Sequence, residues 1–109
     1  MTQSSLEADF TVAWRMWARD APRPVAEYRF DKVRRFRLDF AWPAYHIGVE
    51  LQGGVWTGGR HTRGAGYEQD AVKHNLLQSL GWRCFYVTAS MLRDDPGGVV
   101  RMVREALGC

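Results

Sequence analysis

Two carboxylates and a side-chain amide lie in the stretch of this chain that is most typical of β-strands. Asp39 stands in the apolar run LDFAW, and Glu50 and Gln52 stand in HIGVELQ. Because successive side chains of a strand point to opposite faces, Glu50 and Gln52 are expected to share a polar face of the later strand. Asp39 is expected to share one with Arg35 and Arg37 in the earlier strand. If the two strands pair through the turn WPAY, both carboxylates lie on one face of the sheet.

Two carboxylates on a partly buried face repel each other unless one is protonated or a cation lies between them. Carboxylate and amide oxygens are ligands that suit Mg²⁺ and Mn²⁺. The sequence therefore favours a divalent-metal site at Asp39 and Glu50. The alternative is a surface ion network in which these acids pair with Arg35, Arg37 or other basic residues.

The basic residues of the chain are nearly all arginine, and many lie close together. Of 15 basic residues 13 are arginine, although the formal net charge is only +3. Five lie in the run RFDKVRRFR, residues 29–37, and two in GRHTRG, residues 59–64. The planar guanidinium group suits phosphate and keeps its charge at physiological pH. These runs favour a polyanionic partner such as DNA, with Arg34, Arg35 and Arg37 as contacts, and a solvated arginine-rich surface is the alternative.

Composition and length limit the class of protein. The chain of 109 residues is 46% hydrophobic and 25% charged, which fits one globular domain over residues 1–109 and excludes a disordered chain. It has no run of the roughly 18 apolar residues that a membrane span requires. The N-terminal stretch MTQSSLEADF lacks the basic and then apolar pattern of a signal peptide, so the expected compartment is the cytoplasm.

Hydrophobic periodicity and chain-breaking residues predict an α/β domain whose elements position these side chains. In chain order, the expected elements are a helix over 4–20, strands at about 25–31, 34–41 and 46–52, a helix over 67–81, a strand over 82–88 and a helix over 96–108. Short turns separate the first three strands, so an antiparallel meander is the simplest arrangement.

Alternation along the strands predicts which apolar side chains face the core. Three are expected to share a face in each of the two strands that carry the acids: Phe36, Leu38 and Phe40 in the earlier strand, and Ile47, Val49 and Leu51 in the later one. The helix over 67–81 has an apolar row of Val72, Leu76 and Leu80, which is the face expected to pack.

The stretch GGVWTGGRHTRGAG, residues 53–66, contains six glycines and is too long for a tight turn. A functional loop is predicted here, in which Arg60 and Arg63 hold phosphate groups that glycine allows to approach the backbone. His61 is a candidate general acid or base, or a donor to phosphate, and an ordinary loop histidine is the alternative. Trp56 is a candidate for stacking on a base.

These motifs together resemble the PD-(D/E)XK nuclease superfamily. Asp39 is followed after ten residues by Glu50-Leu51-Gln52 on the next expected strand, and the expected element order matches the αβββαβ core of that superfamily. More narrowly, the GRHTRG loop with the D-x-x-K that follows it, Asp70 to Lys73, is similar to small stand-alone endonucleases, many of them phage-borne. These are related to the very-short-patch-repair nucleases, and the likeness covers about residues 6–88.

The resemblance implies a restriction-endonuclease-like fold with a mixed four-stranded sheet flanked by helices. It also implies a divalent-metal-dependent DNA endonuclease that uses Mg²⁺ or Mn²⁺ and leaves 5′-phosphate and 3′-hydroxyl ends. Nicking of mismatched or branched DNA is favoured over cutting of plain duplex. A phage-encoded enzyme of this kind would act in the cytoplasm of a bacterial host cell.

Carried over to this sequence, the resemblance makes Asp39 and Glu50 the metal ligands, with the Leu51 carbonyl as a third contact. Gln52 stands where the superfamily usually has lysine, and glutamine supplies no positive charge. Lys73, on the following helix, is the candidate replacement, and its alternative is an ion pair with Asp70 one turn earlier.

Glu7 matches an acidic residue on the first helix that, in many members of the superfamily, helps to hold the attacking water. Its alternative is a capping role, because Ser4 and Glu7 have the spacing of a capping box.

Two other functions remain open at the level of sequence. The first is a nucleic-acid-binding module that keeps the nuclease fold without turnover, which the exchange of lysine for Gln52 favours. Retention of both Asp39 and Glu50 opposes it, because carboxylates facing DNA do not help a protein that only binds phosphate. The second is a resolvase of four-way junctions that works as a homodimer.

Overall fold

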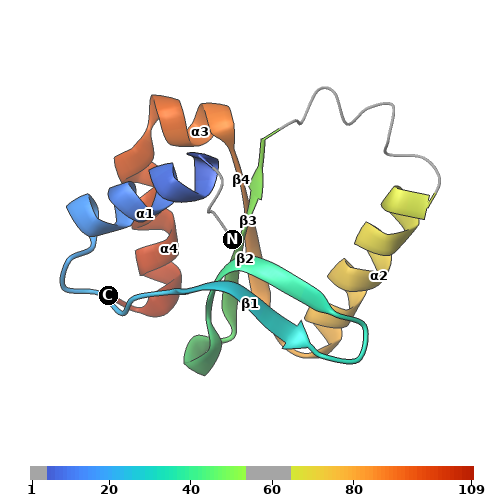
Figure 1. The fold of residues 1–109 in the computed structure, drawn as a ribbon. Coiled ribbons are helices and arrows are strands. Elements are labelled where there is room, and N and C mark those ends of the chain that lie inside the picture. Colours follow the sequence, from blue (N-terminus) through green and yellow to red (C-terminus); the bar gives the residue numbers. More distant parts are fainter. Residues whose placement is uncertain (1–4, 54–64) are drawn as a thin grey trace.

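The computed structural model describes residues 5–53 and 65–109 and confirms the expected α/β class and element order (Figure 1). The elements are α1 (Ser5–Trp17), β1 (Val25–Asp31), β2 (Phe36–Trp42), the short 3₁₀ helix η1 (Pro43–Tyr45), β3 (Ile47–Gln52), α2 (Ala65–Ser79), β4 (Arg83–Thr88), α3 (Ala89–Asp94) and α4 (Pro96–Leu107). Among the helices of these two ranges, none has the length and apolar character needed to cross a bilayer.

The C-terminal helical region differs from the single helix expected there. Thr88 ends β4 and caps α3, because its hydroxyl accepts a hydrogen bond of 3.1 Å from the Met91 N–H. Asp95 caps α4 in the same way, accepting a 3.0 Å hydrogen bond from the Gly98 N–H. The side chains of Thr88 and Asp95 therefore divide the region into two helices, and α3 was missed because its six residues are too few to show a periodic pattern.

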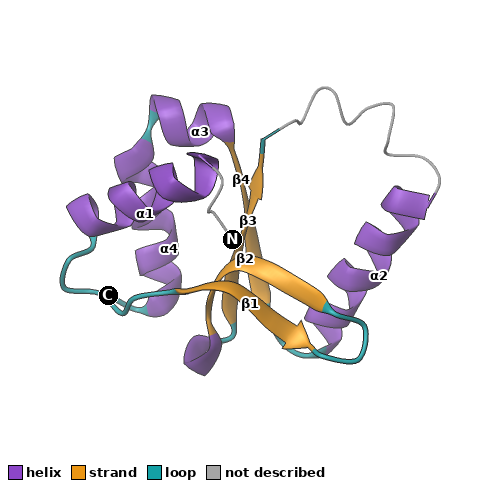
Figure 2. Ribbon diagram, in the orientation of Figure 1, coloured by secondary structure: helices purple, strands orange, loops and turns teal. Residues whose placement is uncertain are grey.

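The four strands form one mixed sheet in the order β1-β2-β3-β4 (Figure 2). The pairs β1–β2 and β2–β3 are antiparallel, which confirms the meander, and β3–β4 is parallel. Two parallel neighbours need a long crossover connection. Helix α2 is part of that connection, and it carries the segment after β3 back across the sheet to the start of β4.

The two faces of the sheet carry separate apolar clusters. The larger one joins α1 and α4 to the sheet, with Phe10 and Phe40 ring centroids 4.8 Å apart and Trp14 and Trp42 centroids 4.9 Å apart. The smaller one consists of Leu38, Ala41, Leu77 and Trp82. Figure 1 shows α1, α3 and α4 together on one side of the sheet and α2 on the other.

The α2 helix packs through a different face from the one its sequence predicts. Val72 and Leu80 are 44% and 46% exposed, whereas Leu77 is 1% exposed and belongs to the smaller cluster. The expected apolar row is therefore wrong. Since residues four apart lie on the same face of a helix, packing of Leu77 also turns Lys73 toward the sheet.

Strand β3 follows the predicted alternation, and β2 does not. Ile47 and Val49 are buried in the larger cluster with Leu51 packed against it, as predicted. In β2, however, Phe40 lies in the larger cluster and Leu38 in the smaller one, so the prediction that they share a face is wrong. The strand changes face between them, at Asp39.

Neighbouring backbone allows this change of face. Pairs between Ala26 and Phe40 and between Tyr28 and Leu38 place Glu27 across from Asp39, and Glu27 has a φ of 50°, which is unusual within a strand. On the other side, Leu38 lies over Gly48, where a side chain would collide with it. The bend of β2 thus depends on the absence of a Cβ atom at Gly48.

We expect Gly48→Ala to lower the free energy of unfolding by about 1–3 kcal/mol, as overpacking of a core does. A Cβ at this position would lie 2.7 Å from Leu38 Cδ1, and Leu38 is fully buried with no room to withdraw. Chemical denaturation measures the change. Combining Gly48→Ala with Leu38→Ala should cost less than the sum of the two single changes, because the second removes the colliding atoms.

Gly53→Ala is the matched control. Its added Cβ meets only Leu6 Cδ2, at an ordinary 3.7 Å, so the expected change is within about 0.5 kcal/mol. Equal losses in the two alanine variants would contradict the packing of Leu38 over Gly48.

Candidate active site

The acids Asp39 and Glu50 lie where β2 and β3 separate. The β2–β3 register runs through the pairs Trp42–Ile47, Ala41–Gly48 and Phe40–Val49, and its continuation places Asp39 across from Glu50. No backbone pair is formed beyond Phe40–Val49 within this ladder. Instead, Asp39 Oδ2 accepts a 2.7 Å hydrogen bond from the Leu51 N–H. A carboxylate therefore takes the place of a main-chain partner at the point where the strands part.

Helix α2 supplies a cation to this point. Lys73 Nζ lies 2.9 Å from Glu50 Oε2, and the side chains of Lys73 and Glu50 are only 20% and 16% exposed. In the described part of the chain Lys73 forms no ion pair with Asp70, the alternative expected from their spacing. The crossover connection thus brings the helical lysine to the carboxylate of the strand.

Burial dominates the electrostatics of both acids. It raises the pKa of the Asp39 carboxyl above its ordinary value, an effect that the Leu51 N–H opposes and the nearby Glu7 charge reinforces. Burial likewise raises the pKa of Glu50, while the charge and hydrogen bond of Lys73 act in the opposite direction. Negative charge is therefore costly in this site, and any additional cation between the acids would stabilise it.

Glu7 reaches the same region from the opposite side of the sheet. It lies on α1, is 7% exposed and is close enough for its charge to raise the pKa of Asp39. Ser4, its expected capping partner, lies outside the described residues. The structure therefore places a second carboxylate near Asp39, and the part of Glu7 in holding the attacking water stays a prediction.

The donor set fits a hard divalent ion. Within residues 5–53 and 65–109, Asp39 Oδ2 accepts a hydrogen bond from the Leu51 N–H and Glu50 Oε2 accepts one from the Lys73 ammonium group. In the same ranges, no three His, Cys, Asp or Glu side chains form a metal-binding group by themselves. Mg²⁺ typically takes only one or two carboxylates and retains several water molecules, so two acids and the Leu51 carbonyl meet its needs.

A pocket of about 470 Å³ opens beside the acids, between α2 and the sheet. Gln52 lines it together with Glu50 and Lys73, so the amide at the usual lysine position and the lysine from α2 face the same space. Residues from α2 and β4 complete the lining, including Tyr67, Asp70, His74, Asn75 and Tyr86.

Two polar residues of this pocket escaped the sequence analysis. Tyr86 pairs with Glu50 in the parallel β3–β4 ladder, and its hydroxyl lies 3.2 Å from His74 Nδ1. Burial is the main factor that raises the pKa of Tyr86, so the phenol stays protonated at neutral pH. Only their positions in the sequence could have indicated that these two residues line the pocket. Tyr86 lies two residues after Cys84 and so shares its face of β4, and His74 directly follows Lys73.

Cys84 lies on the same face of β4, where its environment disfavours the thiolate form. Burial, reinforced by the charge of Glu50, raises the pKa of its thiol to about 12. A thiol with so high a pKa carries almost no thiolate at neutral pH.

Of the arginines predicted to contact nucleic acid, the three in the described residues lie in or next to the β1–β2 turn, and Arg37 is close enough to Asp39 for its charge to lower the pKa of that carboxyl. Arg34 pairs with Asp31 at 2.7 Å and Arg37 pairs with Glu27 at 3.5 Å, and both arginine side chains are about half exposed. Arg35 has a φ of 62° in the turn and forms no ion pair within the described residues. Two of the three charges are thus already offset by carboxylates.

The four loop residues singled out in the sequence lie outside the described ranges. They are Trp56, Arg60, His61 and Arg63. Their predicted contacts with phosphate and bases therefore stay predictions.

Comparison of the chain with protein-family models, with curated proteins and with solved structures finds no match.

The Lys73–Glu50 pair leads to a prediction on stability. Lys73→Met should lower the free energy of unfolding at neutral pH by about 1–3 kcal/mol, because it leaves a mostly buried carboxylate without its cation. Adding Glu50→Gln to Lys73→Met should restore much of the loss, since the uncompensated charge is then removed. Urea denaturation of the single and double variants measures both effects.

Arg93→Met is the matched control, because Arg93 pairs with Asp94 at 3.2 Å but both side chains are about 70% exposed. An exposed pair of this kind contributes less than about 1 kcal/mol. If the two methionine variants lost equal stability, the Lys73–Glu50 pair would have no special importance.

Proposed function

We propose that this protein is a divalent-metal-dependent DNA endonuclease of the PD-(D/E)XK type. The observation that carries the proposal is the pairing of Asp39 with Glu50 at the parting of β2 and β3, beside the Leu51 backbone and the Lys73 ammonium group. Such a site combines oxygen ligands for a hard cation with a positive charge for a phosphate. The resemblance to small phage-type endonucleases, which rests on the same residues of the sequence, implies the same chemistry.

In this proposal Asp39, Glu50 and the Leu51 carbonyl hold Mg²⁺ or Mn²⁺. When bound, the ion supplies Lewis-acid stabilisation of the charge that develops on the phosphate oxygens. The Leu51 N–H fixes Asp39 through its 2.7 Å hydrogen bond, which keeps the second oxygen directed for binding.

The remaining residues act on water and phosphate. Water attacks phosphorus, the bond from phosphorus to the 3′ oxygen breaks, and the products carry 5′-phosphate and 3′-hydroxyl ends. Gln52 orients water or a phosphate oxygen through its amide, and Glu7 accepts a hydrogen bond from the attacking water. Lys73 adds positive charge where the transition state gains negative charge.

The first test is a cleavage assay on labelled single-stranded, duplex, mismatched, flap and four-way-junction DNA. We expect cutting with Mg²⁺ or Mn²⁺ and none with chelator. Asp39→Asn and Glu50→Gln should each lower the rate by at least about 100-fold, because they remove ligands without changing side-chain size. The preferred DNA would separate mismatch nicking from junction resolution, and the oligomeric state during cutting would test for a homodimer.

The proposed endonuclease function would be overturned if the protein cut none of these DNAs and bound them equally well in chelator and in Mg²⁺. The alternative of a catalytically inactive nucleic-acid-binding module would then stand. Besides the glutamine at position 52, the structure adds one observation in favour of this module: Lys73 already neutralises Glu50 at 2.9 Å, which leaves the site less dependent on a metal.

A second test asks whether Lys73 replaces the lysine that Gln52 lacks. Lys73→Met should lower the cleavage rate by about 100-fold, comparable to loss of one group that stabilises transition-state charge. Adding Gln52→Lys should restore part of the rate, because both side chains line the same pocket. The control is Gln52→Lys in the wild-type background, which should keep activity. If the double variant cleaved DNA no faster than Lys73→Met, Lys73 would not be acting in place of a lysine at position 52.

A further inference from the structure

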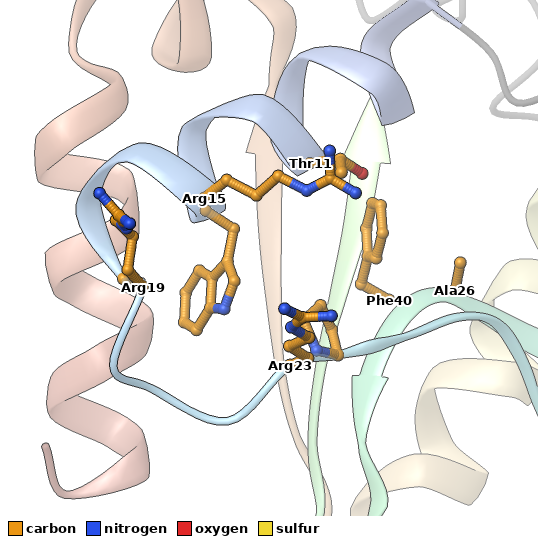
Figure 3. A pocket seen from close by; sticks show the side chains of 9 residues that line it. Thr11, Arg15, Arg19, Arg23, Ala26 and Phe40 are labelled. Atoms are coloured by element: carbon orange, nitrogen blue, oxygen red, sulfur yellow. The ribbon is translucent and has the colours of Figure 1, made fainter.

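An arginine-lined pocket of about 580 Å³ lies on the α1 side of the sheet. Arg15 enters it from α1, Arg19 from the turn after α1, and Arg23 from the segment before β1 (Figure 3). Its other lining residues are Thr11, Trp14, Ala18, Pro24, Ala26 and Phe40. Every charged residue that lines the pocket is therefore an arginine.

No carboxylate offsets these charges in the described part of the chain. The five ion pairs of residues 5–53 and 65–109 do not include Arg15, Arg19 or Arg23. Asp20, the neighbouring acid in sequence, is turned away and pairs with Arg104 at 3.1 Å. Three exposed arginines that line one open pocket give this surface a positive charge that suits an anionic ligand.

The pocket shares two chain segments with the candidate active site. Phe40 lines it and directly follows Asp39 in β2. Thr11 lines it one helical turn after Glu7, and the Thr11 hydroxyl donates a 3.0 Å hydrogen bond to the Glu7 carbonyl. Glu50 and Lys73, by contrast, line the pocket between α2 and the sheet, on the other face (Figure 1).

We propose that Arg15, Arg19 and Arg23 bind the phosphate backbone of DNA. The inference rests on the proposed nuclease function for its ligand, but the binding it describes does not require cleavage. Guanidinium groups suit this ligand because their fixed donors match phosphate oxygens, and a stripe of contacts holds a strand without reading its sequence.

The test measures binding of a labelled DNA duplex in chelator, by fluorescence anisotropy over a range of salt concentrations. Each lost phosphate contact lowers the dependence of log Kd on log salt by about 1, so the triple variant Arg15→Gln, Arg19→Gln, Arg23→Gln should lose about 3. At about 0.1 M salt this corresponds to roughly tenfold weaker binding for each arginine. The triple lysine variant keeps the charge and should retain most of the salt dependence.

Arg101→Gln is the control for a general loss of positive charge, since Arg101 is exposed on α4 and has no ion-pair partner among the residues described. Uncharged methylphosphonate linkages in place of phosphates should weaken binding by wild type more than binding by the triple glutamine variant. Inorganic phosphate added as a competitor separates a site for free anions from one for DNA, because a DNA site needs several linked phosphates.

A triple glutamine variant that binds DNA with the wild-type affinity and salt dependence overturns the inference. A loss of DNA affinity per arginine equal to that of Arg101→Gln also overturns it. The same holds if inorganic phosphate binds the pocket and leaves DNA binding unaffected. The two proposals can fail separately. If the wild-type protein needs these arginines to bind DNA but never cuts it, only the proposed nuclease function is overturned. A protein that cuts with Mg²⁺ and binds equally well without the arginines overturns only the DNA contact.

Discussion

The arrangement of the whole site depends on the bend of β2 at Asp39. A regular strand would keep Leu38 and Phe40 on one face and continue its ladder with β3. Here Leu38 crosses to the α2 side and occupies the space above Gly48, and Phe40 stays with α1. The two strands consequently separate beyond Phe40 and Val49, and the carboxylate of Asp39 bonds to the Leu51 N–H that the ladder leaves without a strand partner. One local irregularity thus produces both the opening and the acid that lies in it.

Packing on each face then places opposite charges around that opening. On one face α1 is held by Phe10 and Trp14, and the same helix carries Glu7 toward Asp39. On the other face Leu77 anchors α2, and Lys73, one turn earlier, reaches Glu50. The cost of burying carboxylates is offset only in part by Lys73 and by the Leu51 N–H, as the raised pKa values of both acids show. A site with this residual imbalance favours binding of a cation.

The sequence predicted this site where the local geometry is regular. Strand β3 is paired on both sides, so alternation correctly placed Ile47 and Val49 in the core and Glu50 on the polar face. Alternation failed in β2, because the side that Leu38 takes depends on a contact with Gly48 that is ten residues away in the chain. Helical periodicity allowed Lys73 to meet either Asp70 or Glu50. Only the crossover of α2 over β3 and β4 decides between them, and this is a tertiary property that a single helix does not encode.

Lysine and arginine occupy different places in the molecule: a lysine meets the buried acids, and arginines line the pocket on the α1 side. Only 2 of the 15 basic residues are lysines, and one of them, Lys73, is the one that meets the acids. An ammonium group is a compact charge that bonds a single oxygen of Glu50, whereas an arginine would tend to engage both oxygens through its planar fork. Lysine at this position offsets the charge of the carboxylate through Glu50 Oε2 alone. Among the described residues, no carboxylate forms an ion pair with Arg15, Arg19 or Arg23. The wider guanidinium group there suits the phosphates of a long polyanion better than an ammonium group does.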